Sequence, residues 1–170
     1  MVSRWRWVLP AAATVAALAL VAACGSNTRS PAVTATTAGN GSDAGAALGG
    51  PGDPGHATRT VTVSATDDHK FTPDSVSAKV GETITFKVTN NGKATHDFVL
   101  GDEQEQTAHD QAMAAMPAGM VMDDTPNAIH IPAGQTKSIT WTFVGAGTTI
   151  YGSHEPGDYA AGMKGTVVAS

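Results

Sequence analysis

The segment ETITFKVTNNG, residues Glu82–Gly92, shows the alternation of a half-buried β-strand that ends in a turn. Ile84, Phe86 and Val88 fall on one face of an extended chain, with threonine and lysine on the other. The Asn-Asn-Gly at its end is typical of a tight reversal, because asparagine and glycine accept the positive φ angles of hairpin turns. The segment therefore predicts a strand that buries one face in a core.

Segments of the same kind recur on both sides of this one. They read TRTVTVSATD, THDFVL, KSITWTF, TTIYGS and GTVVAS, and turns rich in Gly, Pro and Asn separate them. About seven or eight short strands at this spacing predict an all-β, antiparallel sandwich of two sheets. We place this domain at residues 59–170.

One stretch inside the domain, Gly101–Asn127, departs from the strand pattern. It is rich in helix formers and poor in β-branched residues. Asp102 is placed to cap a helix that begins near Glu103, and Pro117 would end it. We therefore predict a short helical insertion between two strands, followed by a methionine-rich loop.

The N-terminal residues 1–23 have the pattern of an export signal. Arg4 and Arg6 precede an apolar run that is shorter than the ~20 residues of a membrane-spanning helix. The run ends in VAAC, which resembles the lipobox of bacterial lipoproteins, whose cysteine becomes diacylated. The resemblance implies lipid attachment at Cys24, and with it a position on the outer face of the cytoplasmic membrane.

Residues 24–58 have the composition of a linker. They are mostly Gly, Ala, Ser, Thr and Pro, without aromatic residues, and cannot bury enough apolar surface to offset the entropy of ordering. We therefore predict a disordered, lipid-anchored tether between the membrane and the β domain.

Charge and cysteine content exclude several classes of protein. The net charge of −5 argues against a nucleic-acid partner, which selects basic surfaces. Cys24 is the single cysteine, so no disulfide forms within the chain, and a lipid on it leaves the domain without a thiol. No nucleophile–base pair or phosphate-binding loop stands out, so we predict no enzymatic activity.

Two stretches then carry a resemblance to a known family. NNGKATHDFVL places His96 at the start of a strand, and YGSHEPGDYAAGMKGTV closes with Met163. Together with FTPDSVSAKVGETITFKVTN and IPAGQTKSITWTF, they resemble the cupredoxins of the plastocyanin/azurin type, and most closely the exported copper-resistance proteins with a Met-rich insertion. The resemblance covers residues 61–168. It implies a Greek-key β-sandwich holding a type 1 copper with two histidines, a cysteine thiolate and a weak methionine.

Residue by residue, the resemblance is incomplete at the metal site. His96 matches the family's first histidine and Met163 its methionine, whereas Ser153 stands at the cysteine position and Asp158 at the second histidine. A serine hydroxyl is a neutral, hard donor, so ordinary blue-copper electron transfer is not expected. The remaining imidazole, carboxylate and thioether of His96, Asp158 and Met163 are the predicted copper ligands. His154, which follows Ser153, is a further candidate copper ligand, although strand alternation would turn it away from a site that Ser153 faces.

The insertion supplies a second set of candidate ligands. His109, Met113 and Met116 would share one face of a helix, and the series continues to Met120 and Met122. Thioethers favour Cu(I), although methionines at helical spacing also commonly fill a core. His69 is expected to be a solvated turn residue, and His130 a surface residue and not a ligand.

The leading hypothesis is a membrane-tethered, extracytoplasmic protein for copper sequestration, handling or resistance. It would bind Cu(I) or Cu(II) and exchange it with a copper-donor or copper-acceptor protein. One alternative is a metal-free interaction domain with an eroded site, and another is an electron-transfer protein with atypical copper ligands. Copper handling predicts that His96, Met163 and part of the methionine series face one cleft. An eroded site predicts methionines packed into the sandwich and no cleft between His96 and Asp158.

Overall fold

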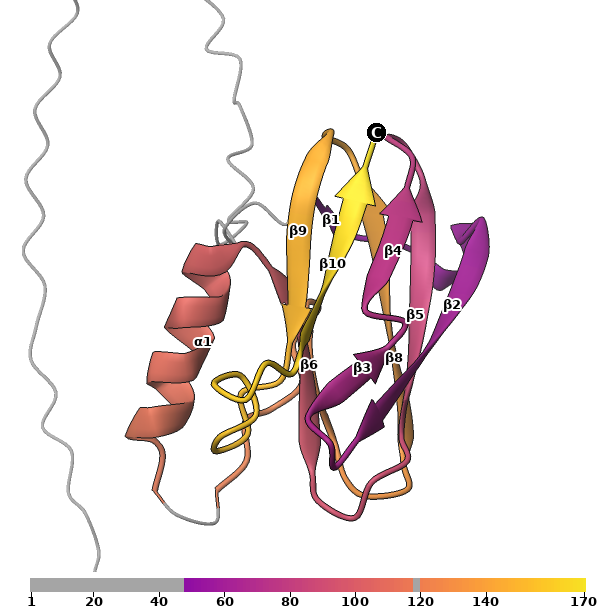
Figure 1. The fold of residues 1–170 in the computed structure, drawn as a ribbon. Helices are drawn as coiled ribbons and strands as arrows, with labels where there is room; N and C mark the ends of the chain where they lie inside the picture. Colours follow the sequence, from indigo (N-terminus) through magenta and orange to yellow (C-terminus); the bar gives the residue numbers. More distant parts are fainter. Residues whose placement is uncertain (1–47, 118–119) are drawn as a thin grey trace, which may run out of the picture. The chain divides into compact units, whose positions relative to one another are not determined.

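The computed structural model describes residues 48–117 and 120–170, which form a sandwich of two five-stranded sheets (Figure 1). In spatial order, the first sheet contains β1 (Gly49–Pro51), β8 (Thr136–Phe143), β5 (Thr83–Asn90), β2 (Arg59–Thr66) and β3 (Lys70–Thr72). The second contains β4 (Ser75–Ala78), β10 (Lys164–Ala169), β9 (Gly147–Gly152), β6 (His96–Gly101) and β7 (Ala128–Ile131). The predicted signal sequence and Cys24 lie outside the described residues. The predicted cupredoxin-like sandwich is confirmed.

Strand β5 shows how the alternation becomes packing. Ile84, Phe86 and Val88 are fully buried between the sheets. On the opposite face, the hydroxyl of Thr85 lies 2.8 Å from that of Thr140 on β8, because the two residues are directly paired. Polar and apolar faces are thus separated as the period of two requires.

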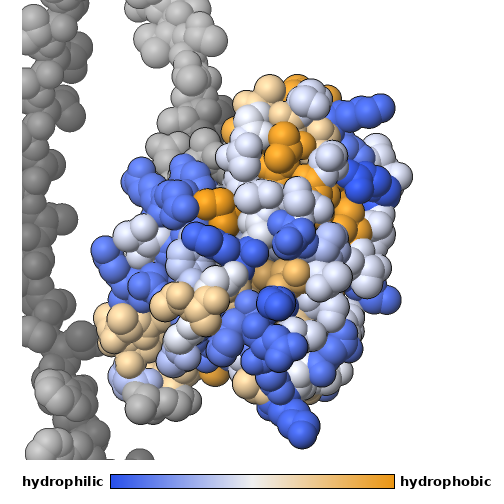
Figure 2. Space-filling model, viewed as in Figure 1, coloured by the Kyte–Doolittle hydropathy of each residue, from blue (hydrophilic) through white to orange (hydrophobic). Residues whose placement is uncertain are grey.

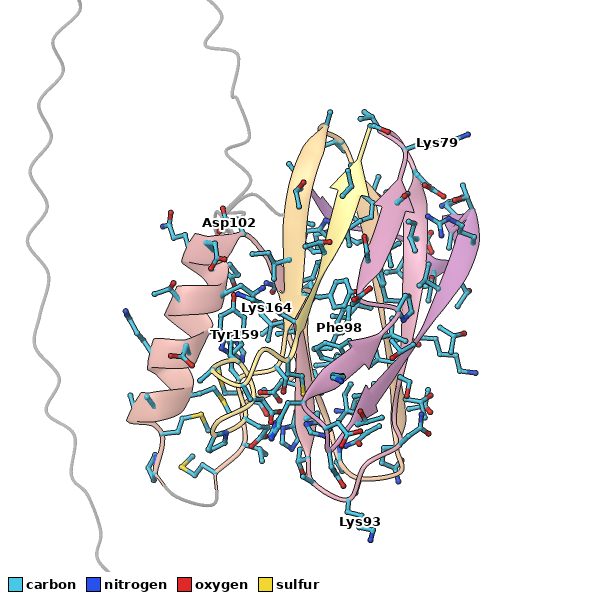
Figure 3. The ribbon with its side chains drawn as sticks, in the orientation of Figure 1. Lys79, Lys93, Phe98, Asp102, Tyr159 and Lys164 are labelled. Atoms are coloured by element: carbon cyan, nitrogen blue, oxygen red, sulfur yellow. The ribbon has the colours of Figure 1, made fainter. Side chains whose placement is uncertain are left out.

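The core between the sheets is dominated by aromatic rings. They belong to Phe71, Phe86, Phe98, Phe143 and Tyr151, with centroids 5.1–6.4 Å apart in the contacting pairs. Phe98 of β6, labelled in Figure 3, contacts the rings of Phe71 and Phe86 and stacks on Tyr151 of the neighbouring β9. Each such ring contributes about 1.5–3 kcal/mol by burial alone, so this core anchors the two strands that carry the candidate site.

Two expectations about the strands need correction. The described residues contain ten strands instead of seven or eight, and β2 pairs with β5, and β4 with β10, in parallel. The predicted linker, residues 24–58, also contains structure at its end. There β1 pairs with β8, and a short 3₁₀ turn spans Pro54–His56. The main chain of β1 finds ladder hydrogen bonds that its glycine-rich composition did not indicate.

The predicted insertion is present as α1 (Glu103–Ala115), which lies against β6 and β9 on the outer side of the second sheet (Figure 1). The carboxylate of Asp102 accepts a hydrogen bond from the Glu105 amide at 2.9 Å, and the helix ends two residues before Pro117. Within α1 the buried residue is Gln106, whose amide nitrogen donates to the Val99 carbonyl at 2.9 Å. Buried polar contacts, not an apolar stripe, therefore hold α1 to the sheet.

In the described part of the chain, no helix has the length and apolar character needed to cross a membrane.

Candidate metal centre

The four positions singled out by the cupredoxin resemblance meet at one end of the sandwich. His96 is the first residue of β6, and the other three belong to a closing loop, residues 153–163, that connects β9 to β10. Within this loop the Ser153 amide donates to the Met163 carbonyl at 3.1 Å, and the Met163 amide donates to the Asp158 carbonyl at 2.9 Å. These bonds fold the loop inward, and all four residues are at most 4 % exposed.

Asp158 organises the polar groups at this position. Its Oδ2 lies 2.8 Å from Nδ1 of His96 and accepts a hydrogen bond from the Ser153 hydroxyl at 2.6 Å. Its Oδ1 lies 2.8 Å from Nδ1 of His69, which precedes β3 with a φ of 55°. We call His69, His96, Ser153 and Asp158 the central network. His69 lies in the turn before β3, as expected, and its side chain is 44 % exposed, but its ring is held by Asp158, a contact that the sequence did not indicate.

The central network does not fit a type 1 copper ion. The residues that the structure describes include no thiol, and Ser153 offers a hydroxyl already bonded to Asp158. Nδ1 of His96 is paired with the carboxylate, and an ion would have to break that contact. Nε2 of His96 is buried without a hydrogen-bond partner among the described residues; its nearest carboxylate, Asp67, is 3.6 Å away. The arrangement is that of a hydrogen-bonded network.

His154 faces the other side, as strand alternation predicted. Its Nε2 lies 2.8 Å from Oε1 of Gln106, and its ring stacks on Tyr159 at 4.5 Å and lies 5.2 Å from that of His109. Figure 3 shows Tyr159 in the space between α1 and the second sheet. Burial lowers the pKa of both His154 and His109. Burial therefore favours the neutral form of both rings, and His154 takes no part in the central network.

A second group of titratable side chains lies on the outer face of the second sheet. Asp97 follows His96, so alternation turns it outward, and it pairs directly with His130 of β7. Nδ1 of His130 lies 3.1 Å from Oδ1 of Asp97 and 3.2 Å from Oε1 of Glu155 in the closing loop. We call Asp97, His130 and Glu155 the outer cluster. One ligand-type atom from each lies within 4.8 Å of the others.

The outer cluster concentrates negative charge in a poorly hydrated place. Burial and the nearby Glu155 raise the pKa of Asp97 to about 6, and burial also raises the pKa of Glu155. Asp97 is 4 % exposed, and its Oδ2 has no hydrogen-bond partner among the described residues. His109 of α1 approaches that oxygen with Nε2 at 3.9 Å, which is beyond hydrogen-bonding distance.

The methionines of the insertion gather around the outer cluster. Met113, Met116 and Met120 line a hollow together with His130 and Glu155. Figure 2 shows weakly hydrophobic residues collected at this C-terminal end of α1. Met122 lines a narrower hollow whose other walls include Asp97, His109 and His130. We call Met113, Met116, Met120 and Met122 the methionine segment.

Two arrangements of the methionine segment were expected, namely packing into the sandwich core or a cleft shared with His96 and Met163, and neither is fully met. Met113, Met116 and Met122 are half-buried and Met120 is 61 % exposed, so they do not fill the sandwich core. His96 and Met163 are not among the residues that line the methionine hollow, so the predicted common cleft is wrong. The methionines face a histidine and a carboxylate that sequence reasoning had left aside. His130, expected to be a surface residue and not a ligand, has a side chain only 15 % exposed.

A two-sheet sandwich with a histidine on one strand beside a closing loop is the architecture of the cupredoxins, and comparison with known proteins agrees. Residues 57–170 match the copper binding proteins of the plastocyanin/azurin family. The chain is 40 % identical to the copper-resistant cuproprotein CopI of Rubrivivax gelatinosus over 126 residues, 74 % of this chain and 75 % of that one. For the CopI of Pseudomonas aeruginosa the identity is 32 % over 148 residues, 71 % of this chain and 81 % of that one.

Solved structures show the same relationship. Auracyanin B superposes with a TM-score of 0.58 and 26 % identity, over 72 % of this chain and 94 % of that one. Reduced auracyanin of Roseiflexus castenholzii gives a TM-score of 0.57 and 26 % identity, over 67 % and 98 %. This chain therefore belongs to the plastocyanin/azurin family of copper binding proteins, which confirms the resemblance seen in the sequence.

Proposed function

We propose that this protein binds copper outside the cytoplasm and sequesters it or hands it on, as part of copper resistance, without a type 1 electron-transfer centre. The observation that carries the proposal is the position of the methionine segment, which collects beside His130 and Glu155 at the surface. The family membership and the name of the CopI relatives, copper-resistant cuproproteins, support it. The proposal includes no catalytic step.

Electron transfer is disfavoured by the donors of the central network. In a blue-copper site the covalent copper–thiolate bond tunes the potential and gives the intense colour. Here the corresponding atom is a hydroxyl oxygen 2.6 Å from the Asp158 carboxylate. A neutral hydroxyl that donates a hydrogen bond to a carboxylate is a poor substitute for a thiolate.

The methionine hollow has the chemistry that Cu(I) requires. Thioethers and imidazole are soft or borderline donors, and Cu(I) accepts them without a rigid geometry. Met113, Met116 and Met120 line the hollow, and half-buried His130 adds an imidazole. Because Met120 is 61 % exposed, a donor or acceptor protein has direct access to the bound ion. A lipid on Cys24 would keep this exchange at the outer face of the membrane.

One observation favours a second candidate, a metal-free interaction domain. Asp158 already forms hydrogen bonds with Nδ1 of His96, with Ser153 and with His69, as expected when an ancestral metal site has been replaced. The two candidates differ in whether the methionine segment binds copper at all.

The test is a Cu(I) competition titration against a chromogenic chelator. The chain without its leader, carrying Cys24→Ser, is compared with the triple variant Met113→Leu, Met116→Leu, Met120→Leu. Met163→Leu is the matched control, since it removes a thioether from the cupredoxin position. Submicromolar Cu(I) binding lost only in the triple variant supports the proposal. Binding lost only in Met163→Leu would place copper at the cupredoxin position. If neither Cu(I) nor Cu(II) binds, the proposal is refuted and the metal-free interaction domain is the remaining candidate.

A further inference from the structure

The outer cluster is built by strand pairing. Asp97 of β6 and His130 of β7 are direct partners in an antiparallel ladder, so their side chains stand together on the same face. The closing loop brings Glu155 against them from the other side, 58 residues after Asp97 in the chain. Three elements thus converge on one point, separated from the central network by the strand itself.

The spacing of the donor atoms suits a single small cation. Nitrogen and oxygen ligands lie about 2.0–2.2 Å from a Zn²⁺-sized ion, so two of them are at most about 4.4 Å apart. Nδ1 of His130 is 3.1 Å from Asp97 and 3.2 Å from Glu155, well within this limit. Nε2 of His109 on α1 is 3.9 Å from the second oxygen of Asp97, so the carboxylate lies between two imidazoles.

Hydrogen bonding alone leaves the cluster incomplete. Nδ1 of His130 carries at most one hydrogen, yet two carboxylates approach it. Oδ2 of Asp97 has no hydrogen-bond partner among the described residues. The residue is only 4 % exposed, so this oxygen is shielded from water as well. An unpaired, buried carboxylate oxygen is costly. A bound cation removes this cost.

We propose that Asp97, His130 and Glu155 form a site for a divalent transition-metal ion, with Cu(II) preferred. Imidazole and carboxylate donors suit Cu(II) and Zn(II), and the affinity order of the divalent ions places copper first. The inference deepens the proposed function, because it assigns Cu(II) to the outer cluster and leaves Cu(I) to the methionine segment. It rests on copper handling only for the choice of ion.

The position of this site links it to the methionine hollow. His130 and Glu155 line that hollow and also belong to the outer cluster. The side chains of His130 and Glu155 are 15 % and 22 % exposed, so an ion reaches the site from the solvent side while Asp97 closes the inner end. Soft donors for Cu(I) and hard donors for Cu(II) thus stand side by side at one surface.

The decisive experiment is a Cu(II) and Zn(II) titration of the chain without its leader, carrying Cys24→Ser. Glu155→Gln is the principal variant, because Glu155 lies on a partly exposed loop and the change keeps its size. Asp158→Asn is the matched control, since it alters a carboxylate of the central network. We expect Glu155→Gln to weaken Cu(II) binding at least tenfold, Asp158→Asn to leave it unchanged, and Zn(II) to bind at the same residues more weakly.

A spectroscopic readout keeps the result independent of stability. Electron paramagnetic resonance of the Cu(II) form should show nitrogen coupling from one imidazole, which is lost in His130→Asn. If wild type fails to bind Cu(II) below micromolar concentrations, or if binding is lost in Asp158→Asn and kept in Glu155→Gln, the inference is overturned. Cu(I) binding by the methionine segment is measured separately, so that the proposed function stands or falls by its own titration.

Discussion

Replacing Asp158 with alanine tests whether the central network stabilises the fold without metal. Asp158 is 4 % exposed, and its carboxylate contacts His96, Ser153 and His69. The variant removes all three contacts at once. His96 is 1 % exposed and Ser153 is fully buried, so neither finds water in exchange.

The expected loss follows from these burials. Leaving a buried polar group without its partner costs about 1–3 kcal/mol. Two such groups, on His96 and Ser153, give a loss of about 2–6 kcal/mol in the free energy of unfolding. His69 adds little, because its side chain is 44 % exposed and water replaces the carboxylate. For a domain of this size, about 4 °C per kcal/mol gives a fall of roughly 8–24 °C in the melting temperature.

The assay is thermal and urea unfolding in EDTA, followed by circular dichroism. The control is Asp68→Ala, which removes an exposed carboxylate in the turn before His69 and should change stability by less than about 0.5 kcal/mol. A loss below about 1 kcal/mol for Asp158→Ala would refute the reasoning. It would mean that the hydrogen bonds of the central network stabilise the fold no more than hydrogen bonds to water do, and that the cupredoxin position is a site for an ion.

Three further outcomes are expected. Gln106→Ala removes the amide that is bonded to the Val99 carbonyl and to His154. It should lower the free energy of unfolding by about 1–3 kcal/mol and speed amide hydrogen exchange in α1. Unchanged exchange would contradict the role of Gln106 in anchoring α1. Folding raises the pKa of Asp97 to about 6, so the metal-free protein is stabilised by protonated Asp97 at low pH. This stabilisation of about 3 kcal/mol is complete below about pH 4 and is lost as the pH rises through 6. The unfolding free energy of wild type relative to Asp97→Asn, measured from pH 4 to pH 7.5, checks this, and a flat difference would be the contrary result. Gly152→Ala places a methyl group 2.7 Å from the ring of Tyr159 and should cost about 1–3 kcal/mol by calorimetry, unless the closing loop moves freely.

Local chemistry decided much of the fold, and the sequence shows it. Ile84, Phe86 and Val88 are buried because a strand alternates with a period of two, whatever its neighbours are. Asp102 caps α1 and Pro117 follows its end, since both effects act within one helical turn. The orientation of His154 away from Ser153 follows from the same alternation.

Pairings between distant residues were decided only by the tertiary structure. Asp97 and His130 are 33 residues apart, and His69 and Asp158 are 89 apart, so no local period relates them. Their contacts depend on the register of β6 against β7 and on the inward fold of the closing loop. For that reason the sequence singled out the central network's position through a family resemblance, while the outer cluster, beside which the methionine segment gathers, appears only when the sheets are packed.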